Sequence, residues 1–182
     1  MFERLSIPDV ILVTPKRHGD ARGFFTETFR ADAFVEAGIR GPFVQDNHAY
    51  SQQPGVLRGL HFQKPPHAQA KLVRCTHGAI YDVAVDIRQG SPTFGHHVGA
   101  ELSGENGEQL YVPEGFAHGY LTLTPECHVQ YKTSAYYAPE TEAGLAWDDP
   151  ELGINWPTDR INVILSDKDR TLPTLSALAP VF

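Results

Sequence analysis

Apolar and polar residues alternate along most of this chain in short runs with the period of half-buried β-strands. The alternating runs are 10–13, 23–29, 57–63, 71–74, 79–87, 97–102, 108–112, 118–123 and 127–133. Turns rich in Gly, Pro and Asn separate them. A single stretch, 32–37, predicts a helix, with Asp32 as its cap, Phe34 and Val35 as its apolar contacts and Gly38 at its end. The pattern indicates an all-β protein with short peripheral helices.

The strand over 57–63 carries unusual side chains for a structural strand, namely Arg58 and His61, and Lys71 opens the next one. Strict alternation places Arg58 and His61 on opposite faces. Because glycine within a strand often marks a bulge, we expect Gly59 to bring both side chains to one face. In a β-barrel, polar side chains of this kind point into the mouth, where ligand sites are built.

The run 79–87 alternates most cleanly, and its odd-numbered positions are predicted to be buried, with Asp82 and Asp86 on the other face. About ten short strands with little helix are typical of a sandwich or jelly roll. A chain of 182 residues without repeats or linkers is most simply one domain, 1–182.

Composition narrows the classes of function. The net charge of −7 argues against a nucleic-acid binder and against a protein bound to anionic membranes. Cys75 and Cys127 provide no disulfide framework and are interpreted as reduced thiols of a cytoplasmic protein. The first residues lack the apolar core of a signal peptide, and no run has membrane-spanning length.

A metal site is weighed first, since the chain has nine His residues. Cupin-class jelly rolls often combine a His-x-His pair with a later His that follows a Pro-x-Gly turn. Pro113-Glu114-Gly115 before His118 fits the later part, but Gln63 stands where the partner of His61 is needed. Two ligands are too few for a first-row metal, so no metal is expected. No Gly-x-Ser-x-Gly elbow or phosphate loop is present in the sequence either. A polar cavity rich in His, Tyr, Lys and Arg permits proton transfer beside a carbonyl without singling it out.

Several motifs, in order and spread over nearly the whole chain, add a resemblance. They are Asp20-x-Arg22-Gly23-Phe24-Phe25-x-Glu27, Gln45-Asp46-Asn47-His48, Gly55 to Gln63, Lys71 to Arg74, Asp82 to Arg88, Ser91 to Gly95, Pro113 to Gly119, Tyr131-Lys132, Tyr136-Tyr137, Trp147 to Pro150 and Leu165 to Asp169. Together they resemble the dTDP-4-dehydrorhamnose 3,5-epimerase family.

The resemblance implies a cupin-type jelly roll, usually a homodimer, that acts in making dTDP-L-rhamnose. The family inverts C3 and C5 of dTDP-4-dehydro-6-deoxy-D-glucose with no cofactor and no metal. By position, the resemblance implies His61 as the base, Asp169 as its orienting partner, Lys71 beside the C4 oxygen and Tyr131 as the acid. It also implies that Tyr137 stacks on the thymine. The remaining implied substrate contacts are Arg22, Glu27, Gln45, Asn47, Arg58, His118, Glu142 and Lys168.

Structural alternatives stand beside these roles. Asp169 could cap the last turn, Tyr131 and Tyr137 could be core aromatics, and His118 could support its Gly-rich turn. Arg22, Glu27, Glu142 and Lys168 could be solvated surface charges. At the level of function, the alternatives are a 3- or 5-epimerase acting at one carbon of a dTDP-4-keto-6-deoxy sugar, a non-catalytic sugar-nucleotide-binding cupin, and a metal-dependent oxygenase.

Overall fold

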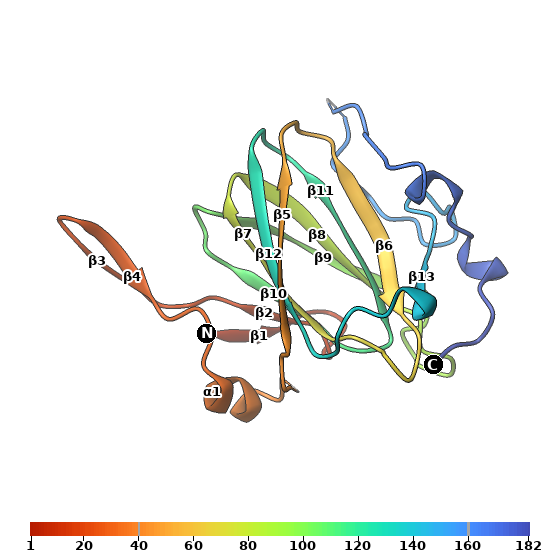
Figure 1. Ribbon diagram of the computed structural model, residues 1–182, viewed down its shortest axis with the longest axis horizontal. Helices are drawn as coiled ribbons and strands as arrows, with labels where there is room; N and C mark the ends of the chain where they lie inside the picture. Colours follow the sequence, from red (N-terminus) through yellow and green to blue (C-terminus); the bar gives the residue numbers. More distant parts are fainter. Residues whose placement is uncertain (40, 160) are drawn as a thin grey trace.

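The computed structural model describes residues 1–39, 41–159 and 161–182, which form two facing antiparallel sheets and a projecting hairpin (Figure 1). The six-stranded sheet has the order β1-β2-β10-β7-β12-β5, and its strands are β1 (Phe2–Arg4), β2 (Ile11–Val13), β10 (Gln109–Val112), β7 (Lys71–His77), β12 (Cys127–Thr133) and β5 (Gln45–Ser51). The five-stranded sheet has the order β13-β6-β11-β8-β9, and its strands are β13 (Glu142–Gly144), β6 (Leu57–Gln63), β11 (Phe116–Thr122), β8 (Ala79–Asp86) and β9 (His97–Ser103). The predicted all-β, double-sheet class is confirmed.

The core between the sheets takes side chains from both of them. Val73 of β7 and Val129 of β12 face Ala84 of β8 and Tyr120 of β11 in one buried cluster. Each is a position on the inner side of its strand, as alternation requires. Polar side chains on the inner faces of two such sheets lie together beyond the end of the shared apolar core.

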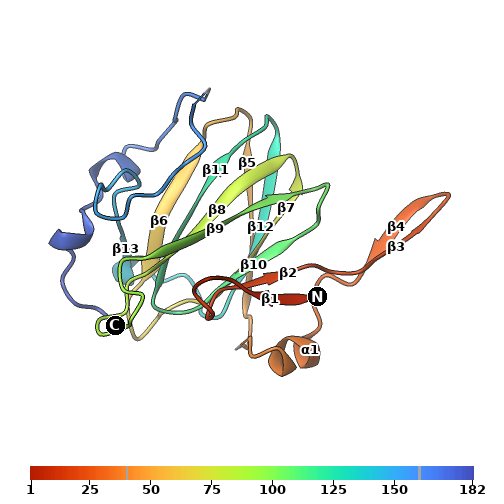
Figure 2. The same ribbon diagram turned by 180° about the vertical axis from the view of Figure 1, so that it is seen from behind.

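A second apolar cluster covers the outer face of the five-stranded sheet. Val83 and Leu121 of that sheet pack against Leu145, Trp156 and Leu175 of the C-terminal segment. In Figures 1 and 2 this segment, in blue, runs alongside β6 and β13. Since β8 is therefore covered on both faces, the positions opposite its predicted buried set, Ile80, Asp82, Ala84 and Asp86, are buried as well.

The consequence for β8 is that Asp82 and Asp86 are fully buried, each with 0% exposure. Burial raises the pKa of Asp86, but hydrogen bonds donated by Arg88, Ser91 and Thr93 outweigh it and lower the pKa to about 2. A buried carboxylate needs such donors, because desolvation alone disfavours its charge. Alternation cannot reveal this arrangement, because it is read from apolar positions alone.

Helix α1 (Ala31–Glu36) packs Phe34 on the outer face of the six-stranded sheet. Arg30 occupies the N-cap, and Asp32 lies in the first turn, so the predicted cap is shifted. Asp32 Oδ1 accepts hydrogen bonds from Ala33 N–H and Arg30 Nε, each at 2.7 Å. Val35 is 66% exposed, so its predicted apolar contact is wrong. No helix in the described part of the chain is long and apolar enough to span a bilayer.

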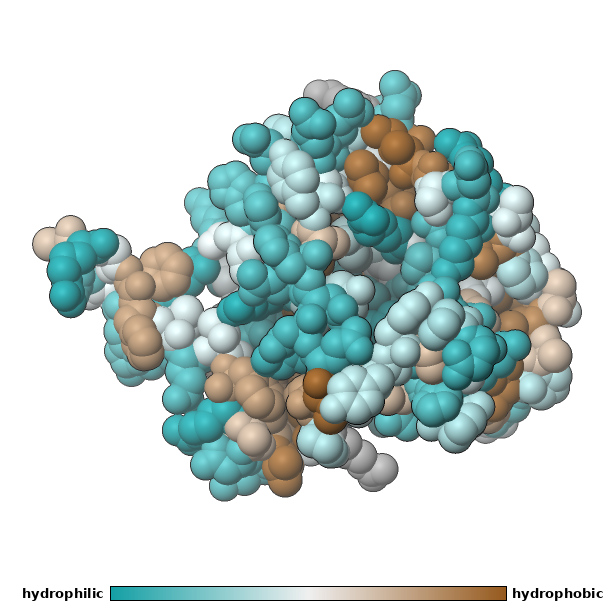
Figure 3. Space-filling model, viewed as in Figure 1, coloured by the Kyte–Doolittle hydropathy of each residue, from teal (hydrophilic) through white to brown (hydrophobic). Residues whose placement is uncertain are grey.

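Strands β3 (Arg17–Asp20) and β4 (Gly23–Thr26) form a separate hairpin, here called the arm, that projects from the body (Figures 1 and 3). Its side chains Phe24 and Phe25 are 58% and 73% exposed. Two adjacent, solvent-facing phenylalanines on a projecting hairpin are characteristic of a surface that another body covers.

Candidate active site

The irregularity expected at Gly59 is present and brings two site residues to one face. Residues three apart on β6, Arg58 and His61, pair with β11 residues only two apart, Tyr120 and His118. Gly59 has φ +131°, and a Cβ there would meet the β11 backbone at 2.5 Å, so only glycine fits. The extra residue on β6 is a bulge, and Arg58 and His61 line the same cavity.

His61, Lys71 and Tyr131 line two adjoining cavities of about 260 and 370 Å³. The smaller one is also lined by Gln45, Asn47, Phe62, Gln63, Gln69, Thr133, Tyr137 and Glu142. The larger one is also lined by Ala49, Val56, Leu57, Arg58, His118, Tyr120, Ile164, Leu165, Ser166 and Asp169. His61, Lys71 and Tyr131 line both cavities and therefore lie at their junction, where one elongated ligand can contact all three.

His61 forms an ion-pair-type contact with Asp169, whose Oδ1 lies 2.5 Å from His61 Nε2. The C-terminal segment reaches β6 through a parallel bridge, in which Leu57 N–H donates to Ile164 O at 3.0 Å. Asp169 then begins a short 3-10 turn, and its N–H donates to Ser166 Oγ at 3.1 Å. Contrary to the structural alternative, Asp169 does not cap this turn, because Lys168 is the N-cap and the Asp169 carboxylate faces the histidine. The distant carboxylate fixes the orientation of the imidazole.

The surroundings keep His61 in its neutral form. Burial lowers the pKa of His61, and the nearby Lys71 and Lys168 lower it further, against the raising effect of Asp169. With Nε2 turned toward Asp169, ring nitrogen Nδ1 is the one available to a ligand, and no described residue hydrogen-bonds to it. A neutral imidazole with one free nitrogen is a general base at neutral pH.

Lys71 is the buried cation of the site, with 9% exposure, and its Nζ donates to the His61 carbonyl at 3.2 Å. Burial lowers the pKa of Lys71 to about 8, although the carboxylates of Asp82 and Glu142 favour its charge. At pH 7 the ammonium is therefore still mostly protonated. A desolvated cation at this position can stabilise negative charge on a ligand oxygen.

Tyr131 reaches the cavity from the opposite sheet. It lies on β12, between Asn47 of β5 and Val73 of β7. Burial raises the pKa of the Tyr131 phenol, and Glu142 raises it further, while Arg58 lowers it. The hydroxyl is therefore protonated at neutral pH and can act as an acid.

His118 is held by a buried carboxylate. Asp82 Oδ1 lies 2.8 Å from His118 Nε2, and the two side chains are 0% and 7% exposed. Because a buried charge requires a partner, this pair fixes the His118 ring at the wall of the larger cavity. Asp82 therefore supports the His118 ring, which also lines the larger cavity.

The end of the smaller cavity carries Tyr137, Glu142 and Lys168. Tyr137 is 55% exposed, its N–H donates to Gln45 Oε1 and its hydroxyl donates to Glu142 Oε2, both at 3.0 Å. Lys168 Nζ lies 2.5 Å from Glu142 Oε1. Tyr137 is thus a fixed, exposed ring and not a core aromatic, and Glu142 and Lys168 form a pair at the cavity rim.

Arg22, Glu27 and Lys168 are predicted site residues that line neither cavity, although Lys168 pairs with Glu142, which lines the smaller one. Arg22 lies in the arm turn, 2.5 Å from Asp20, and its side chain is 90% exposed. Glu27 follows the arm and pairs with Arg30 at 3.6 Å. The side chains of Arg22 and Glu27 therefore lie outside the two cavities of their own chain.

The sequence pattern missed three polar residues of the site: Gln63, Asp82 and Tyr120. Gln63 holds the chain near Tyr137, because its Oε1 accepts from Ala138 N–H at 2.9 Å. Tyr120 could have been found from His118, since residues two apart on a strand share a face. No pattern in the sequence identified Asp82 as a site residue, because alternation placed it on the face of its strand opposite the predicted buried side chains.

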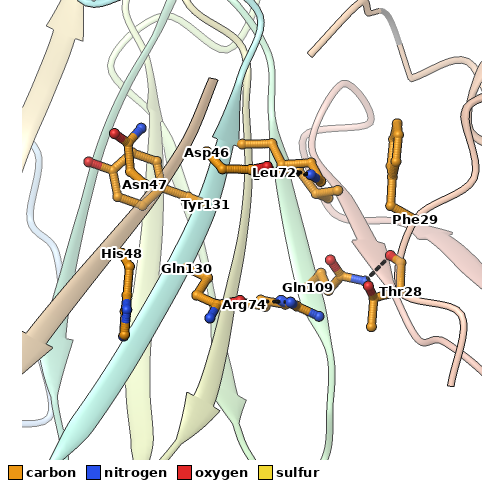
Figure 4. Close-up of a pocket in the computed structure, with 11 residues that line it drawn as sticks. Thr28, Phe29, Asp46, Asn47, His48, Leu72, Arg74, Gln109, Gln130 and Tyr131 are labelled. Carbon is orange, nitrogen blue, oxygen red and sulfur yellow. Dashed lines mark hydrogen bonds and ion pairs between the residues drawn. The ribbon is translucent and has the colours of Figure 1, made fainter. Parts of the chain in front are cut away.

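A third cavity, of about 520 Å³, lies on the outer side of the six-stranded sheet beside the base of the arm (Figure 4). Arg74 Nη2 donates to Gln130 Oε1 at 2.7 Å, and Gln109 Nε2 donates to Thr28 O at 2.7 Å. The groove is therefore polar and already hydrogen-bonded within the chain. Over the described residues, no group of three or more His, Cys, Asp or Glu side chains is arranged to hold a metal ion.

Comparison with known proteins gives one consistent result. The sequence model of the family described as dTDP-4-dehydrorhamnose 3,5-epimerase matches residues 4–177. A dTDP-4-dehydrorhamnose 3,5-epimerase from Sinorhizobium fredii is 52% identical over 181 residues, covering 100% of this chain and 92% of its own.

Solved structures give the same result. The dTDP-6-deoxy-D-glucose-3,5-epimerase from Legionella pneumophila in complex with dTDP-4-keto-L-rhamnose is similar, with a TM-score of 0.94 and 46% identity over 98% of this chain and 94% of that one. A 3'-monoepimerase from Streptomyces bikiniensis in complex with dTDP-quinovose has a TM-score of 0.88 and 40% identity over 94% of this chain and 86% of that one. The jelly-roll fold and the epimerase class expected from the motifs are confirmed. The chain belongs to the dTDP-4-dehydrorhamnose 3,5-epimerase family.

Proposed function

We propose that this enzyme inverts C3 and C5 of dTDP-4-dehydro-6-deoxy-D-glucose and gives dTDP-4-dehydro-L-rhamnose, in dTDP-L-rhamnose biosynthesis. The observation that carries the proposal is the junction of the two cavities. There, a neutral His61 bound to Asp169 lies in the same space as the buried Lys71 and Tyr131. This set contains a base, a cation for an enolate oxygen and an acid, and the comparisons support the reaction.

The two inversions use the same residues because C3 and C5 both flank the C4 ketone. His61 Nδ1 removes the proton from carbon, and the electron pair moves onto the C4 oxygen as an enolate. The Lys71 ammonium stabilises that oxygen. Tyr131 then donates its proton to the opposite face of the same carbon, which inverts it. His61 releases its proton to solvent and Tyr131 takes one up from solvent, which restores the site for the next inversion.

The smaller cavity is proposed to hold the nucleotide. Tyr137 is exposed and fixed on two sides, by Gln45 and Glu142, so its ring is ready to stack on thymine. The cationic Lys168 at the rim and Arg58 in the larger cavity suit the charges of the diphosphate. Gln45, Asn47 and Glu142 are proposed as further polar contacts.

The substrate assignment is tested by proton NMR of the enzyme and keto sugar nucleotide in deuterated water. Deuterium at both C3 and C5 and appearance of the inverted sugar are expected. Deuterium at one carbon after prolonged incubation would identify a single-site epimerase, like the relative from Streptomyces bikiniensis. His61→Ala should abolish exchange at both carbons, because one base is proposed for both.

We further propose that the enzyme is a homodimer in which each arm completes the partner's site. The arm exposes Phe24 and Phe25 and holds Arg22 and Glu27 away from its own cavities. In a two-fold dimer, each arm can reach the other subunit by the same contact.

Mixing two inactive variants tests the shared site. If Arg22 acts in the partner's site, co-expressed Arg22→Ala and His61→Ala chains form mixed dimers with one intact site in each. Random pairing puts half of the dimers in this class, so about one quarter of wild-type activity should return. Recovery should be absent if Arg22 serves its own chain, and light scattering with a monomer mass would refute the dimer.

We also propose a cytoplasmic location, supported by the buried free thiols of Cys75 and Cys127. Reduced cysteines persist in a reducing compartment. Immunoblotting of fractionated cells, with the protein found outside the cytoplasmic fraction, would refute this.

A further inference from the structure

Tyr120 carries a hydroxyl that packing does not explain. Tyr120 is 4% exposed, and its hydroxyl is buried without a hydrogen-bond partner among the described residues. Leaving a buried hydroxyl unpaired costs folding free energy, and a phenylalanine ring of the same shape avoids that cost. The ring itself belongs to the apolar cluster between the sheets. The hydroxyl is therefore the part of the side chain that needs a role.

Tyr120 lies in the wall of the larger cavity. Tyr120 lines the cavity with His61, Lys71 and Tyr131. It lies two residues after His118 on β11, with the two ring centroids 6.4 Å apart. The reacting part of the substrate has to lie over this same set of residues.

The neighbouring strands keep the Tyr120 phenol protonated. In strand register, Tyr120 is flanked by Asp82 of β8 and Arg58 of β6. Burial raises the pKa of Tyr120, and Tyr131 and Asp82 raise it further, while Arg58 lowers it. A phenol that stays neutral across the physiological range is a permanent hydrogen-bond donor.

We propose that the Tyr120 hydroxyl donates a hydrogen bond to an oxygen of the bound hexose and is a specificity-determining residue for the sugar part of the substrate. This inference rests on the proposed function, because it assigns the larger cavity to the hexose of a dTDP-sugar. In the bound state the sugar oxygen supplies the partner that the free enzyme lacks. The site then rejects a ligand without that oxygen, since binding it leaves the hydroxyl buried and unpaired.

The role differs from that proposed for Tyr131. An acid that protonates carbon controls inversion at saturating substrate, whereas a sugar contact controls affinity. The two roles therefore separate in a comparison of kcat with KM. They separate further when a nucleotide without a sugar is compared with a nucleotide sugar.

The experiment is calorimetric titration of wild type, Tyr120→Phe and Tyr81→Phe with dTDP and with dTDP-D-glucose. Tyr81 is the matched control, because it lies on neighbouring β8 and its ring packs against Trp156, outside both cavities. Tyr120→Phe should weaken dTDP-D-glucose binding by about 3- to 10-fold and change dTDP binding by less than about twofold. Tyr81→Phe should leave both affinities unchanged.

Stability and turnover supply independent readouts. Tyr120→Phe should melt at the wild-type temperature or above it, because it removes an unpaired buried hydroxyl. Its KM for the keto sugar nucleotide should rise by the same factor as the dTDP-D-glucose dissociation constant, with kcat little changed. The titrations need no turnover, so an inactive wild type would refute the proposed reaction and not this sugar contact.

Four results would overturn the proposal. The first is unchanged affinity for dTDP-D-glucose in Tyr120→Phe, and the second is an equal loss for dTDP and for dTDP-D-glucose. The third is a lower melting temperature or misfolding of Tyr120→Phe, which would show that the hydroxyl serves the fold. Loss of inversion at saturating substrate with exchange retained would likewise overturn it, since Tyr120 would then be the acid.

Discussion

The substitution Asp169→Asn tests how the Asp169 side-chain carboxylate affects His61, the proposed base. The substitution keeps the shape of a side chain that is 5% exposed, and it replaces the oxygen 2.5 Å from His61 Nε2 with an amide. The interaction with Asp169 raises the pKa of His61, so removing the charge makes the imidazole a weaker base. An amide N–H that donates to Nε2 also forces the ring proton onto Nδ1, the nitrogen proposed to remove the substrate proton.

The expected loss is large because the wrong tautomer has no lone pair for the reaction. Losing general-base assistance costs about 10²- to 10⁴-fold in rate, and loss of the correct tautomer belongs at the upper end of that range. Binding should change little, since the Asp169 carboxylate lies behind the imidazole and the nucleotide contacts are elsewhere. The loss should therefore be in kcat, with KM nearly constant.

The assay is solvent deuterium exchange at C3 and C5, followed by NMR at saturating substrate. Asp167→Asn is the matched control, because it makes the same change two residues away at an exposed position. Circular dichroism establishes that both variants are folded. Exchange in Asp169→Asn within about threefold of wild type would refute the orienting role, since a general base depends on this partner far more strongly than that.

Four further predictions follow from the site. Activity requires neutral His61, whose pKa is lowered by burial, and protonated Lys71, so kcat/KM should fall on the acid side as His61 becomes protonated and on the alkaline side above about pH 8. Lys71→Arg should move the alkaline fall upward, and a fall that stays near pH 8 contradicts this. Tyr131→Phe should keep much of the deuterium exchange and lose most net inversion, by about 10²–10⁴-fold, and near wild-type inversion would show that Tyr131 is not the acid. Tyr137→Ala should weaken dTDP binding by roughly tenfold or more, as measured by calorimetry, whereas Tyr137→Phe, which keeps the ring, should be nearly silent. Activity should survive EDTA treatment, and activity that vanishes and then returns with a divalent ion would refute metal independence.

Much of the fold was predictable because its strands follow local alternation. The runs 57–63 and 127–133 coincide with β6 and β12. The bulge at Gly59 was predictable as well, since the side chains of Arg58 and His61 fall on opposite faces of the strand without it. Alternation did not show that Asp82 is buried, because Asp82 shares the face of Ile80 and Ala84, which packs between the two sheets. The other face of β8 is covered by residues more than sixty positions further along the chain. Local periodicity contains no information about such a distant covering layer.

The site was predictable in its residues but not in its assembly. The contact between His61 and Asp169 spans 108 positions, and no pattern of spacing specifies it. The motif that contains Arg22 was recognised, yet its place on an exposed arm follows only from the three-dimensional structure. Tyr120 escaped notice because a tyrosine in an apolar strand has the same periodicity as any core aromatic.

The path of the C-terminal segment also couples the candidate site to the packing of the five-stranded sheet. The strands that carry His61, Lys71 and Tyr131 precede residue 134, whereas Asp169 and the bridge at Ile164 belong to the segment that covers the outer face of that sheet. Detachment of this segment separates His61 from its carboxylate partner and uncovers the apolar outer face of β8 and β11 in the same event. A chain whose segment is detached therefore displays an apolar surface of the kind that chaperones and proteases recognise.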